Sequence, residues 1–255
     1  MQPATGMTSF VRDLKFACRM LGKRPGTTGL ILLTWGLGIG ASVTLFSLVD
    51  ALYVRPLNVS APSRLVHGYQ TRPDAADPAP MSLSDYFYYR EHAKSFQELA
   101  AHYPSSPMHV LVDGEPVSIT GSVVTASYFR VLRLIPHLGR FFGPDEDAVR
   151  DREAVAVISH RFWQGQLGGD PAVIGRSISI NGRPFAVIGV APPGFDGVVR
   201  GGSVSEAWIP SAMFGVGYRY CDAFARDCTV VDLLGRLQPT VSIEAARSEI
   251  DVLAR

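Results

Sequence analysis

The first pattern that could support chemistry is the glycine run Gly36-Leu-Gly38-Ile-Gly40-Ala41, which lies inside an apolar segment. It fits the G-x-G-x-x-G/A fingerprint, in which glycines let the backbone approach a dinucleotide pyrophosphate. That fingerprint needs a βαβ unit and an acidic residue about 20 positions further on. Position 56 is Pro56, and no alternation of helices and strands follows. We therefore expect no cofactor at these glycines.

Histidine and acidic side chains are the other candidates for metal or acid–base chemistry. Asp145-Glu146-Asp147 concentrates three carboxylates, but such a run is typical of a solvated turn. Neither a nucleophile elbow nor a G-x-x-x-x-G-K-[ST] phosphate loop occurs in the sequence. The sequence therefore predicts no catalytic residue, no cofactor, no metal site and no ATP-binding motif, so we do not expect an enzyme. The six histidines are scattered and lack the paired spacing of metal ligands: His67, His92, His102, His109, His137 and His160.

Cysteine chemistry is confined to one pair. Three cysteines in 255 residues are too few for a disulfide scaffold. Cys221 and Cys228 lie seven positions apart. In an oxidising compartment they would close a small disulfide loop, which we favour over two free thiols.

The element that must position everything else is the apolar stretch Gly29–Val49. Its 21 residues include eleven Leu, Ile, Val or Phe, with no charge and no proline. As a helix it would cover about 30 Å, the hydrocarbon thickness of a bilayer. A cleaved signal peptide is the alternative, but its apolar core is usually 7–15 residues, shorter than this stretch. We therefore predict an uncleaved transmembrane helix over residues 29–49.

Two glycines in this span could mediate helix contacts. Gly36 and Gly40 are four positions apart, so they form a small-residue stripe along which another transmembrane helix could pack. The alternative is that both are merely tolerated in a lipid-embedded helix.

The charge distribution predicts the orientation of the span. Residues 1–28 hold five basic residues and Asp13 as the single acid, whereas residues 51–255 hold 19 basic and 21 acidic residues. Positive flanks stay in the cytoplasm, so residues 1–28 are expected inside and residues 50–255 outside. A formal net charge of +1 gives no support for nucleic-acid binding.

The basic segment before the span also has a helical pattern. Its apolar positions recur at helical spacing among the basic residues, which favours an amphipathic helix on the inner leaflet over a disordered basic tail. We expect Pro25-Gly26 to end this helix before the span begins. The apolar positions are Phe10, Leu14, Ala17 and Leu21.

Beyond the span, helical and strand patterns mix without regular alternation, so the predicted class is α+β. The clearest signal is Ser177–Val190, where two strand-like runs flank Asn181-Gly182, the favoured pair for a type I′ hairpin turn. Further helices are expected at Ser82–His102, Ser127–Leu134, around Phe162-Trp163 and at Ser242–Arg255, and further strands at Val117–Val124, Ala154–Ile158 and Glu206–Pro210.

From Asp13 onward, a basic helix, a glycine-containing first span and then a series of short motifs follow in order over about 240 residues. This order resembles the N-terminal part of a MacB-like ABC transporter permease, especially its orphan branch with duplicated units. None is diagnostic alone. The motifs are Arg55-Pro-Leu57, Pro62-Ser-Arg-Leu-Val66, Met81-Ser-Leu-Ser-Asp-Tyr86 with Ser95-Phe96, Ser127-Tyr-Phe-Arg-Val-Leu132, Leu138-Gly-Arg-Phe-Phe142 with Asp145-Glu-Asp147, Val155-Ala-Val-Ile-Ser159 with Phe162-Trp163, Gly168-Gly-Asp-Pro171, Ile174-Gly-Arg176, Ile180-Asn-Gly182, Val187-Ile-Gly-Val-Ala-Pro192, Gly194-Phe195 and Trp208-Ile-Pro210.

The resemblance implies a transmembrane helix followed by a periplasmic core domain over residues 50–255, with a β-rich second lobe. It further implies the bacterial inner membrane as location. The implied partners are the lipid bilayer, a separate ABC-type ATPase subunit, a second permease copy as a homodimer or paired permease, and a periplasmic adaptor. The implied role is to couple an ATP-driven conformational change across the inner membrane to the periplasmic domain, for export or efflux. Family members carry three further spans, so we expect this chain to be a fragment of a longer permease. The alternative function is a single-pass anchored binding or scaffold module.

Overall fold

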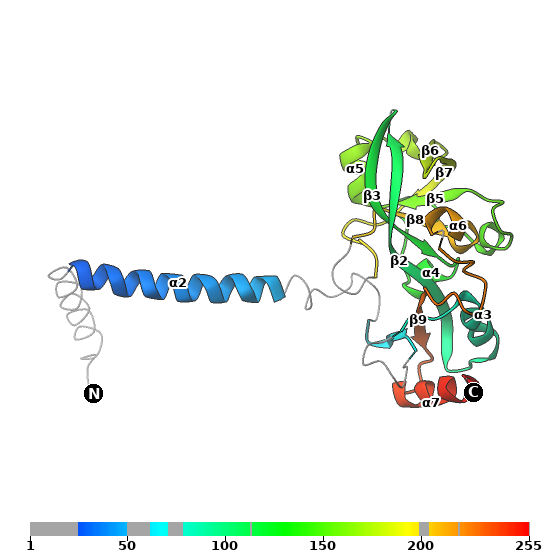
Figure 1. Cartoon of the computed structure of the whole chain (residues 1–255), viewed down its shortest axis with the longest axis horizontal. Helices are drawn as coiled ribbons and strands as arrows, with labels where there is room; N and C mark the ends of the chain where they lie inside the picture. Colours follow the sequence, from blue (N-terminus) through cyan, green and yellow to red (C-terminus); the bar gives the residue numbers. More distant parts are fainter. Residues whose placement is uncertain are drawn as a thin grey trace, which may run out of the picture. The chain divides into compact units, whose positions relative to one another are not determined.

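The computed structural model describes residues 25–49, 62–70, 79–112, 114–198, 204–218 and 220–254 (Figure 1). The chain divides into two compact units, Met1–Arg55 and Pro56–Arg255. The described part of the first unit is a single helix, and the second unit is a folded domain. The amphipathic helix predicted before the span lies outside the described residues.

The helix of the first unit, α2, runs over Pro25–Val49. It begins four residues before the predicted start, because proline is accommodated at the first helical position, where no backbone N–H is needed. Its stretch Thr28–Ser47 is the one segment, among the residues described, that is long and apolar enough to cross a membrane by length and composition. The large apolar side chains of α2 are exposed, from 58% for Val43 to 75% for Phe46.

The folded unit mixes strands and helices, as the predicted α+β class requires. Its helices are α3 (Leu83–His92), α4 (Tyr128–Val131), α5 (His160–Gln166), α6 (Phe214–Gly217) and α7 (Ile243–Leu253), with short 3-10 turns η2 (Pro62–Arg64), η3 (Pro144–Asp147), η4 (Pro171–Val173) and η5 (Ser211–Met213). Its strands are β1 (Leu65–Gly68), β2 (Phe96–Val112), β3 (Glu115–Val124), β4 (Leu138–Gly139), β5 (Val155–Ile158), β6 (Ser177–Ile180), β7 (Arg183–Val190), β8 (Ala207–Pro210) and β9 (Asp232–Leu237).

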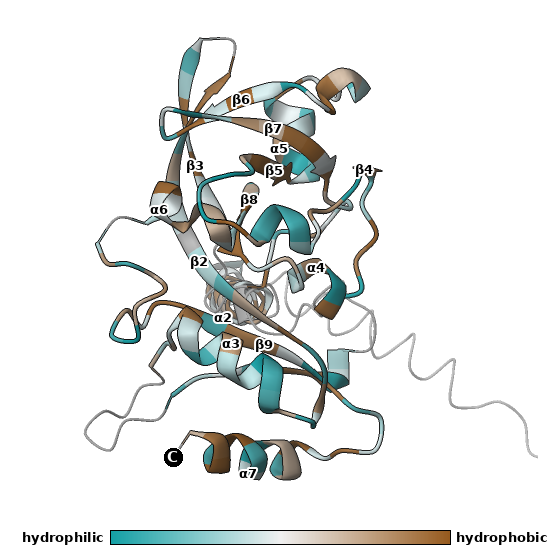
Figure 2. Ribbon diagram, turned by 90° about the vertical axis from the view of Figure 1, so that its right-hand side faces the viewer, coloured by the Kyte–Doolittle hydropathy of each residue, from teal (hydrophilic) through white to brown (hydrophobic). Residues whose placement is uncertain are grey.

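Six of these strands close into a barrel. The hydrogen-bonded order is β1-β9-β2-β3-β8-β5-β7-β4, and β6 pairs with both β2 and β7. The path β2-β3-β8-β5-β7-β6 therefore returns to β2. Closure leaves these six strands without a free edge between them, which removes a template for unwanted pairing. In Figure 2, β5 is coloured hydrophobic, in keeping with the burial of all four of its residues.

Strand β2 is 17 residues long and belongs to two parts of the fold. Its first residues, Phe96–His102, pair with β9, and its later residues pair with β3 and β6. The register of the β2–β3 ladder shifts between Tyr103 and Ser106, where the strand leaves the β1–β9 side for the barrel. Figure 1 shows β9 and α7 at one end of the domain and β5, β6 and β7 at the other.

The predicted helix over Ser82–His102 is half correct. Helix α3 ends at His92, and its C-cap Ala93 is extended. The backbone N–H groups of Lys94 and Ser95 then donate to the Glu249 carboxylate of α7, each over 2.8 Å. The chain is thus diverted by a tertiary contact, and the apolar residues that follow form the start of β2 instead of a helical face.

The remaining strand and helix predictions agree with the structure to within a few residues. The hairpin of β6 and β7 turns at Asn181 and Gly182, whose φ values of 49° and 82° are the left-handed values of a type I′ turn. Helix α7 begins at the Ser242 cap, whose hydroxyl accepts a hydrogen bond from the Ala245 N–H.

Candidate functional site

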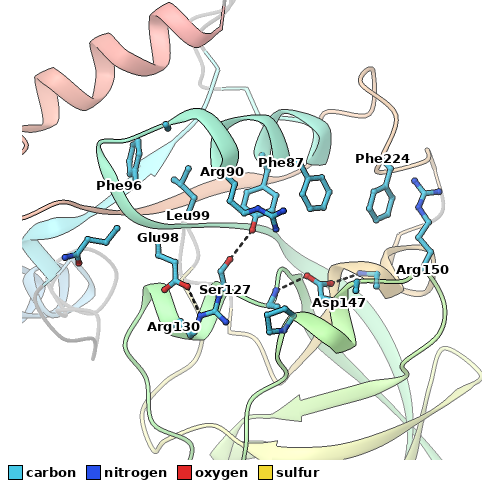
Figure 3. A pocket seen from close by; sticks show the side chains of 17 residues that line it. Phe87, Arg90, Phe96, Glu98, Leu99, Ser127, Arg130, Asp147, Arg150 and Phe224 are labelled. Carbon is cyan, nitrogen blue, oxygen red and sulfur yellow. Dashed lines mark hydrogen bonds and ion pairs between the residues drawn. The ribbon is translucent and has the colours of Figure 1, made fainter.

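A concave pocket with a volume of about 540 Å³ lies beside α3 in the folded unit. Figure 3 shows Phe87 and Arg90 reaching into it from α3, opposite Ser127 and Asp147. We call it the arginine pocket because three arginines line it. Its other lining residues are Tyr86, Ala93, Phe96, Gln97, Glu98, Leu99, Ala126, Arg130, Pro144, Ala148, Arg150, Ala212 and Phe224.

Helix α3 is fixed at its start by a reciprocal cap. The Ser82 hydroxyl accepts from the Asp85 N–H over 3.0 Å, and the Asp85 carboxylate accepts from the Ser82 N–H over 3.1 Å. The Ser84 hydroxyl donates to the Phe224 carbonyl oxygen over 2.7 Å. The α3 side of the pocket is therefore tied to the loop that carries Phe224.

Two arginines of the pocket stack on aromatic rings. The Arg150 guanidinium carbon lies 3.6 Å from the Phe224 ring centroid, and that of Arg90 lies 5.1 Å from the Phe87 centroid. Stacking a guanidinium on a ring leaves its N–H edge available for hydrogen bonds. Arginine and aromatic side chains are the residues most enriched at the centres of binding interfaces.

Two arginines of the pocket make exposed ion pairs. Arg130 Nε lies 2.6 Å from Glu98 Oε1, and Arg150 Nη2 lies 3.1 Å from Asp222 Oδ1. Their side chains are 32–58% exposed, so each pair contributes little to stability and its cation can be shared with a ligand. The pocket can therefore attract an anionic or carbonyl-rich partner.

Asp147 lines the pocket and accepts hydrogen bonds from three neighbouring groups. Asp147 Oδ1 accepts from the Ser211 hydroxyl and the Ala212 N–H, both over 2.8 Å, and Oδ2 accepts from the Ala126 N–H over 2.9 Å. Burial raises the pKa of Asp147, although these hydrogen bonds act to lower it. Asp147 therefore joins η3 to η5 and to the end of β3, and the prediction of a solvated acidic turn is wrong at this residue.

Its neighbours in the acidic run have other surroundings. Glu146 accepts from the Gly143 N–H over 2.7 Å and pairs with Arg140. Partial burial acts to raise the pKa of Glu146, but the hydrogen bonds from Arg140 and Gly143 outweigh it and the pKa is lowered. Asp145 is exposed, as predicted.

The two cysteines singled out from the sequence lie on the loop beside this pocket. Cys221 and Cys228 are joined by a disulfide, with their Cα atoms 5.8 Å apart. The loop that they close carries Asp222 and Phe224, which hold Arg150 from two sides. The crosslink thus restrains one wall of the arginine pocket.

The other predicted site residues lie in α2. The added Cβ of a side chain at Gly36 or Gly40 would meet nothing within 4 Å. Both glycines thus lie on an open surface of α2, and their proposed contact with another helix stays a prediction.

Four histidines that are scattered in the sequence form two pairs in the structure. The His67 and His102 rings lie 5.7 Å apart, and those of His137 and His160 lie 4.9 Å apart. Asp232 completes a cluster with His67 and His102. These groups come from strands far apart in the sequence, so linear spacing could not have revealed them.

A closed six-stranded barrel continuous with a small flanking sheet, preceded in the sequence by one apolar helix, defines an α+β domain. The chain belongs to the family of MacB-like periplasmic core domains, whose model matches residues 28–253. The resemblance drawn from the short motifs is thereby confirmed. No curated protein sequence matches the chain significantly.

Solved structures share this fold at low sequence identity. The periplasmic region of MacB from Actinobacillus actinomycetemcomitans is 15% identical, with a TM-score of 0.57, and the match covers 74% of this chain and 81% of that one. The extracellular domain of the noncanonic ABC-type transporter YknZ from Gram-positive bacteria is 18% identical, with a TM-score of 0.52, and the match covers 72% of this chain and 88% of that one. At these identities the likeness concerns the fold.

Proposed function

We propose that this chain is the permease part of a MacB-like ABC transporter of the bacterial inner membrane, which couples ATP-driven conformational change to an extracytoplasmic domain for export or efflux. The observation that carries this proposal is the family match over residues 28–253, which includes both the apolar window of α2 and the folded unit. In this proposal residues 1–28 are cytoplasmic, 29–49 span the bilayer and 50–255 are periplasmic, with the barrel as a β-rich second lobe.

The chemistry of α2 supports a lipid environment. The hydroxyl groups of Thr34 and Thr44 donate to the carbonyl oxygens of Leu30 and Gly40, each over 2.8 Å, so neither needs water. Insertion is favoured by about 0.3–0.6 kcal/mol for each Leu, Ile, Val or Phe near the middle. The excess of basic residues before α2 supports a cytoplasmic N-terminus.

In this proposal the energy comes from an ATPase domain or subunit outside residues 1–255, because these residues carry no phosphate-binding loop. We propose an ABC-type ATPase subunit as partner, a homodimer or a paired permease through the Gly36 and Gly40 stripe, and a periplasmic adaptor. Residues 51–57 contain neither Gly nor Ser, so a Gly/Ser insert there would introduce a flexible linker that the sequence lacks.

A topology experiment tests the membrane part. Fusion of alkaline phosphatase after residue 254 should give an active enzyme in the membrane fraction, because phosphatase matures only outside the cytoplasm. Replacing Leu33 and Leu37 with arginine should release the fusion from that fraction, since a charge at the centre of the span costs about 2.5–3.5 kcal/mol. A fusion that is inactive, or that is soluble without the arginines, contradicts the proposal.

A coupling experiment tests the transport part. The chain is co-expressed with a candidate ABC-type ATPase from the same genome, and the two are purified together from membranes. The rate of ATP hydrolysis by the complex should change when a partner or substrate binds the extracytoplasmic domain. A flexible Gly/Ser insert after Leu57 should abolish that change in rate. Hydrolysis and export that are unaffected by the insert would count against mechanical coupling.

The second candidate function is a single-pass anchored binding or scaffold module, and the arginine pocket favours it. Stacked guanidinium groups, aromatic rings and exposed ion pairs are the components of a partner-binding surface. Purification of the chain from membranes with a periplasmic partner and no ATPase supports this alternative, and recovery of the ATPase supports the transporter.

A further inference from the structure

Three strands of the flanking sheet bring two histidines and a carboxylate to one face. In the β2–β9 ladder His102 lies opposite Asp232, and in the β1–β9 ladder His67 lies opposite Leu234. Asp232 and Leu234 are two positions apart and so project from the same face of β9. The ligand atoms of His67, His102 and Asp232 consequently all lie within 4.8 Å of one another.

The middle of this cluster is a buried imidazole. His102 is 1% exposed, and neither Nδ1 nor Nε2 has a hydrogen-bond partner among the described residues. Its ring packs against the Tyr128 and His67 rings at centroid distances of 5.6 and 5.7 Å. These contacts account for the faces of the ring but not for its nitrogens. A buried polar atom without a partner costs about 1–3 kcal/mol, so two on one side chain need a further explanation.

The other two side chains provide a route from solvent. His67 and Asp232 are half-buried, and β1 is the edge strand of the sheet order. Leu234 separates Asp232 from Arg236 along this face of β9, and the Arg236 Nε–H donates to the Val131 carbonyl oxygen over 2.7 Å. The hydrogen bond holds that guanidinium toward α4, and Asp232 supplies the carboxylate of the cluster.

We propose that His67, His102 and Asp232 form a binding site for a divalent transition metal ion, with Zn²⁺ as the best match and water at the fourth position. Two imidazoles and one carboxylate are a donor set that Zn²⁺ accepts, whereas Ca²⁺ and Mg²⁺ require a shell of oxygens. Donors around a tetrahedral Zn²⁺ are about 3.3 Å apart, so side-chain rotations that close the widest gap by about 1.5 Å would complete the site. The bound ion would crosslink the edge strand β1 to β9 and β2.

The chain offers a matched control. His137 and His160 also bring two imidazole rings together, with centroids 4.9 Å apart, and the described residues place no third ligand with them. Replacing both with alanine removes a pair of neighbouring histidines without touching the cluster. Asp232→Asn keeps the size of the side chain and removes one charged ligand. His67→Ala removes a second ligand at a half-buried position.

The test uses the full chain in detergent, stripped of metal by a chelator and then titrated with Zn²⁺ against a chromophoric competitor. We expect a single Zn²⁺ per chain and a higher melting temperature in its presence. Asp232→Asn and His67→Ala should each weaken binding at least about ten-fold, because even outer-shell partners of a metal contribute that much. The doubly substituted His137→Ala and His160→Ala chain should bind as tightly as the parent.

Two results would overturn the proposal. One is equal Zn²⁺ affinity in the parent, Asp232→Asn and His67→Ala chains. The other is loss of binding in the His137 and His160 control. If both ligand variants fail to fold, the X-ray absorption spectrum of the Zn²⁺-loaded chain that carries His137→Ala and His160→Ala decides, because its second histidine pair is gone. Two imidazole ligands support the site, and an all-oxygen shell or a single imidazole refutes it.

Discussion

The sharpest stability prediction concerns Asp147, which joins three segments of the folded unit below the arginine pocket. Asp147→Ala removes the acceptor of two backbone N–H groups, those of Ala126 and Ala212, and of the Ser211 hydroxyl. A buried donor left without an acceptor costs about 1–3 kcal/mol, and the hydroxyl can rotate toward another acceptor. Removal of a carboxylate whose burial raises its pKa recovers part of this loss.

The expected net loss for Asp147→Ala is therefore about 2–5 kcal/mol in the free energy of unfolding. At about 2–4 °C per kcal/mol for a unit of this size, the melting temperature should fall by about 4–20 °C. Asp147→Asn keeps one acceptor oxygen but turns an N–H₂ group toward a donor, so it should lose about 1–3 kcal/mol.

The assay is urea unfolding of the full chain in detergent, followed by near-ultraviolet circular dichroism, which reports the packing of the folded unit. Asp145→Ala is the matched control, because Asp145 belongs to the same acidic run and is exposed. It should change stability by less than about 0.5 kcal/mol. Equal losses for the alanine variants of Asp145 and Asp147 would refute the assignment of Asp147 as a half-buried connector.

Three further predictions follow from other parts of the domain. Replacing Cys221 and Cys228 with serine should lower stability by about 2–3 kcal/mol through a less restrained unfolded chain, measured by urea unfolding with and without reductant. Partial burial acts to raise the pKa of Glu249, but its hydrogen bonds outweigh burial and the pKa is lowered. Glu249 therefore stabilises the folded unit above the ordinary glutamate pKa, and this stabilisation is lost as the pH falls below that value. Glu249→Gln should flatten that part of the stability–pH curve. Gly189→Ala places a methyl group against a neighbouring backbone carbonyl oxygen and should destabilise the barrel by about 2 kcal/mol or more. Gly165→Ala, in the exposed part of α5, should instead stabilise the folded unit by about 0.5–1 kcal/mol. Thermal unfolding measures both changes.

Local signals in the sequence predicted the elements whose cause is local. The β6–β7 hairpin follows from Asn181-Gly182, whose backbone must adopt positive φ. Helix α7 follows from its serine cap and one-sided apolar pattern. The apolar helix α2 follows from composition and length alone.

Strand β9 could not be predicted in this way, because both of its faces are covered. Leu233 belongs to the apolar cluster that includes α3, and Leu234 belongs to the cluster that includes α4. A strand buried on both faces has no alternation of apolar and polar residues. The start of β2 has the same arrangement, with Leu99 and Ala101 in one cluster and Ala100 in the other. Its apolar residues were therefore compatible with a helix.

The candidate sites were missed for a related reason, since each is assembled by strand pairing and loop placement. The arginine pocket unites α3, the η3 turn and the disulfide loop, and Arg150 contacts Phe224 although 74 residues separate them in the sequence. The histidine cluster depends on one register: a shift of β9 by one residue would turn Asp232 to the opposite face of the sheet. Strand β2 contributes to both places, with Glu98 and Leu99 in the pocket and His102 in the cluster. Because this segment continues into the closed barrel, β2 is one continuous backbone element shared by the pocket, the cluster and the barrel. A change in the position of β2 must therefore alter the geometry of all three.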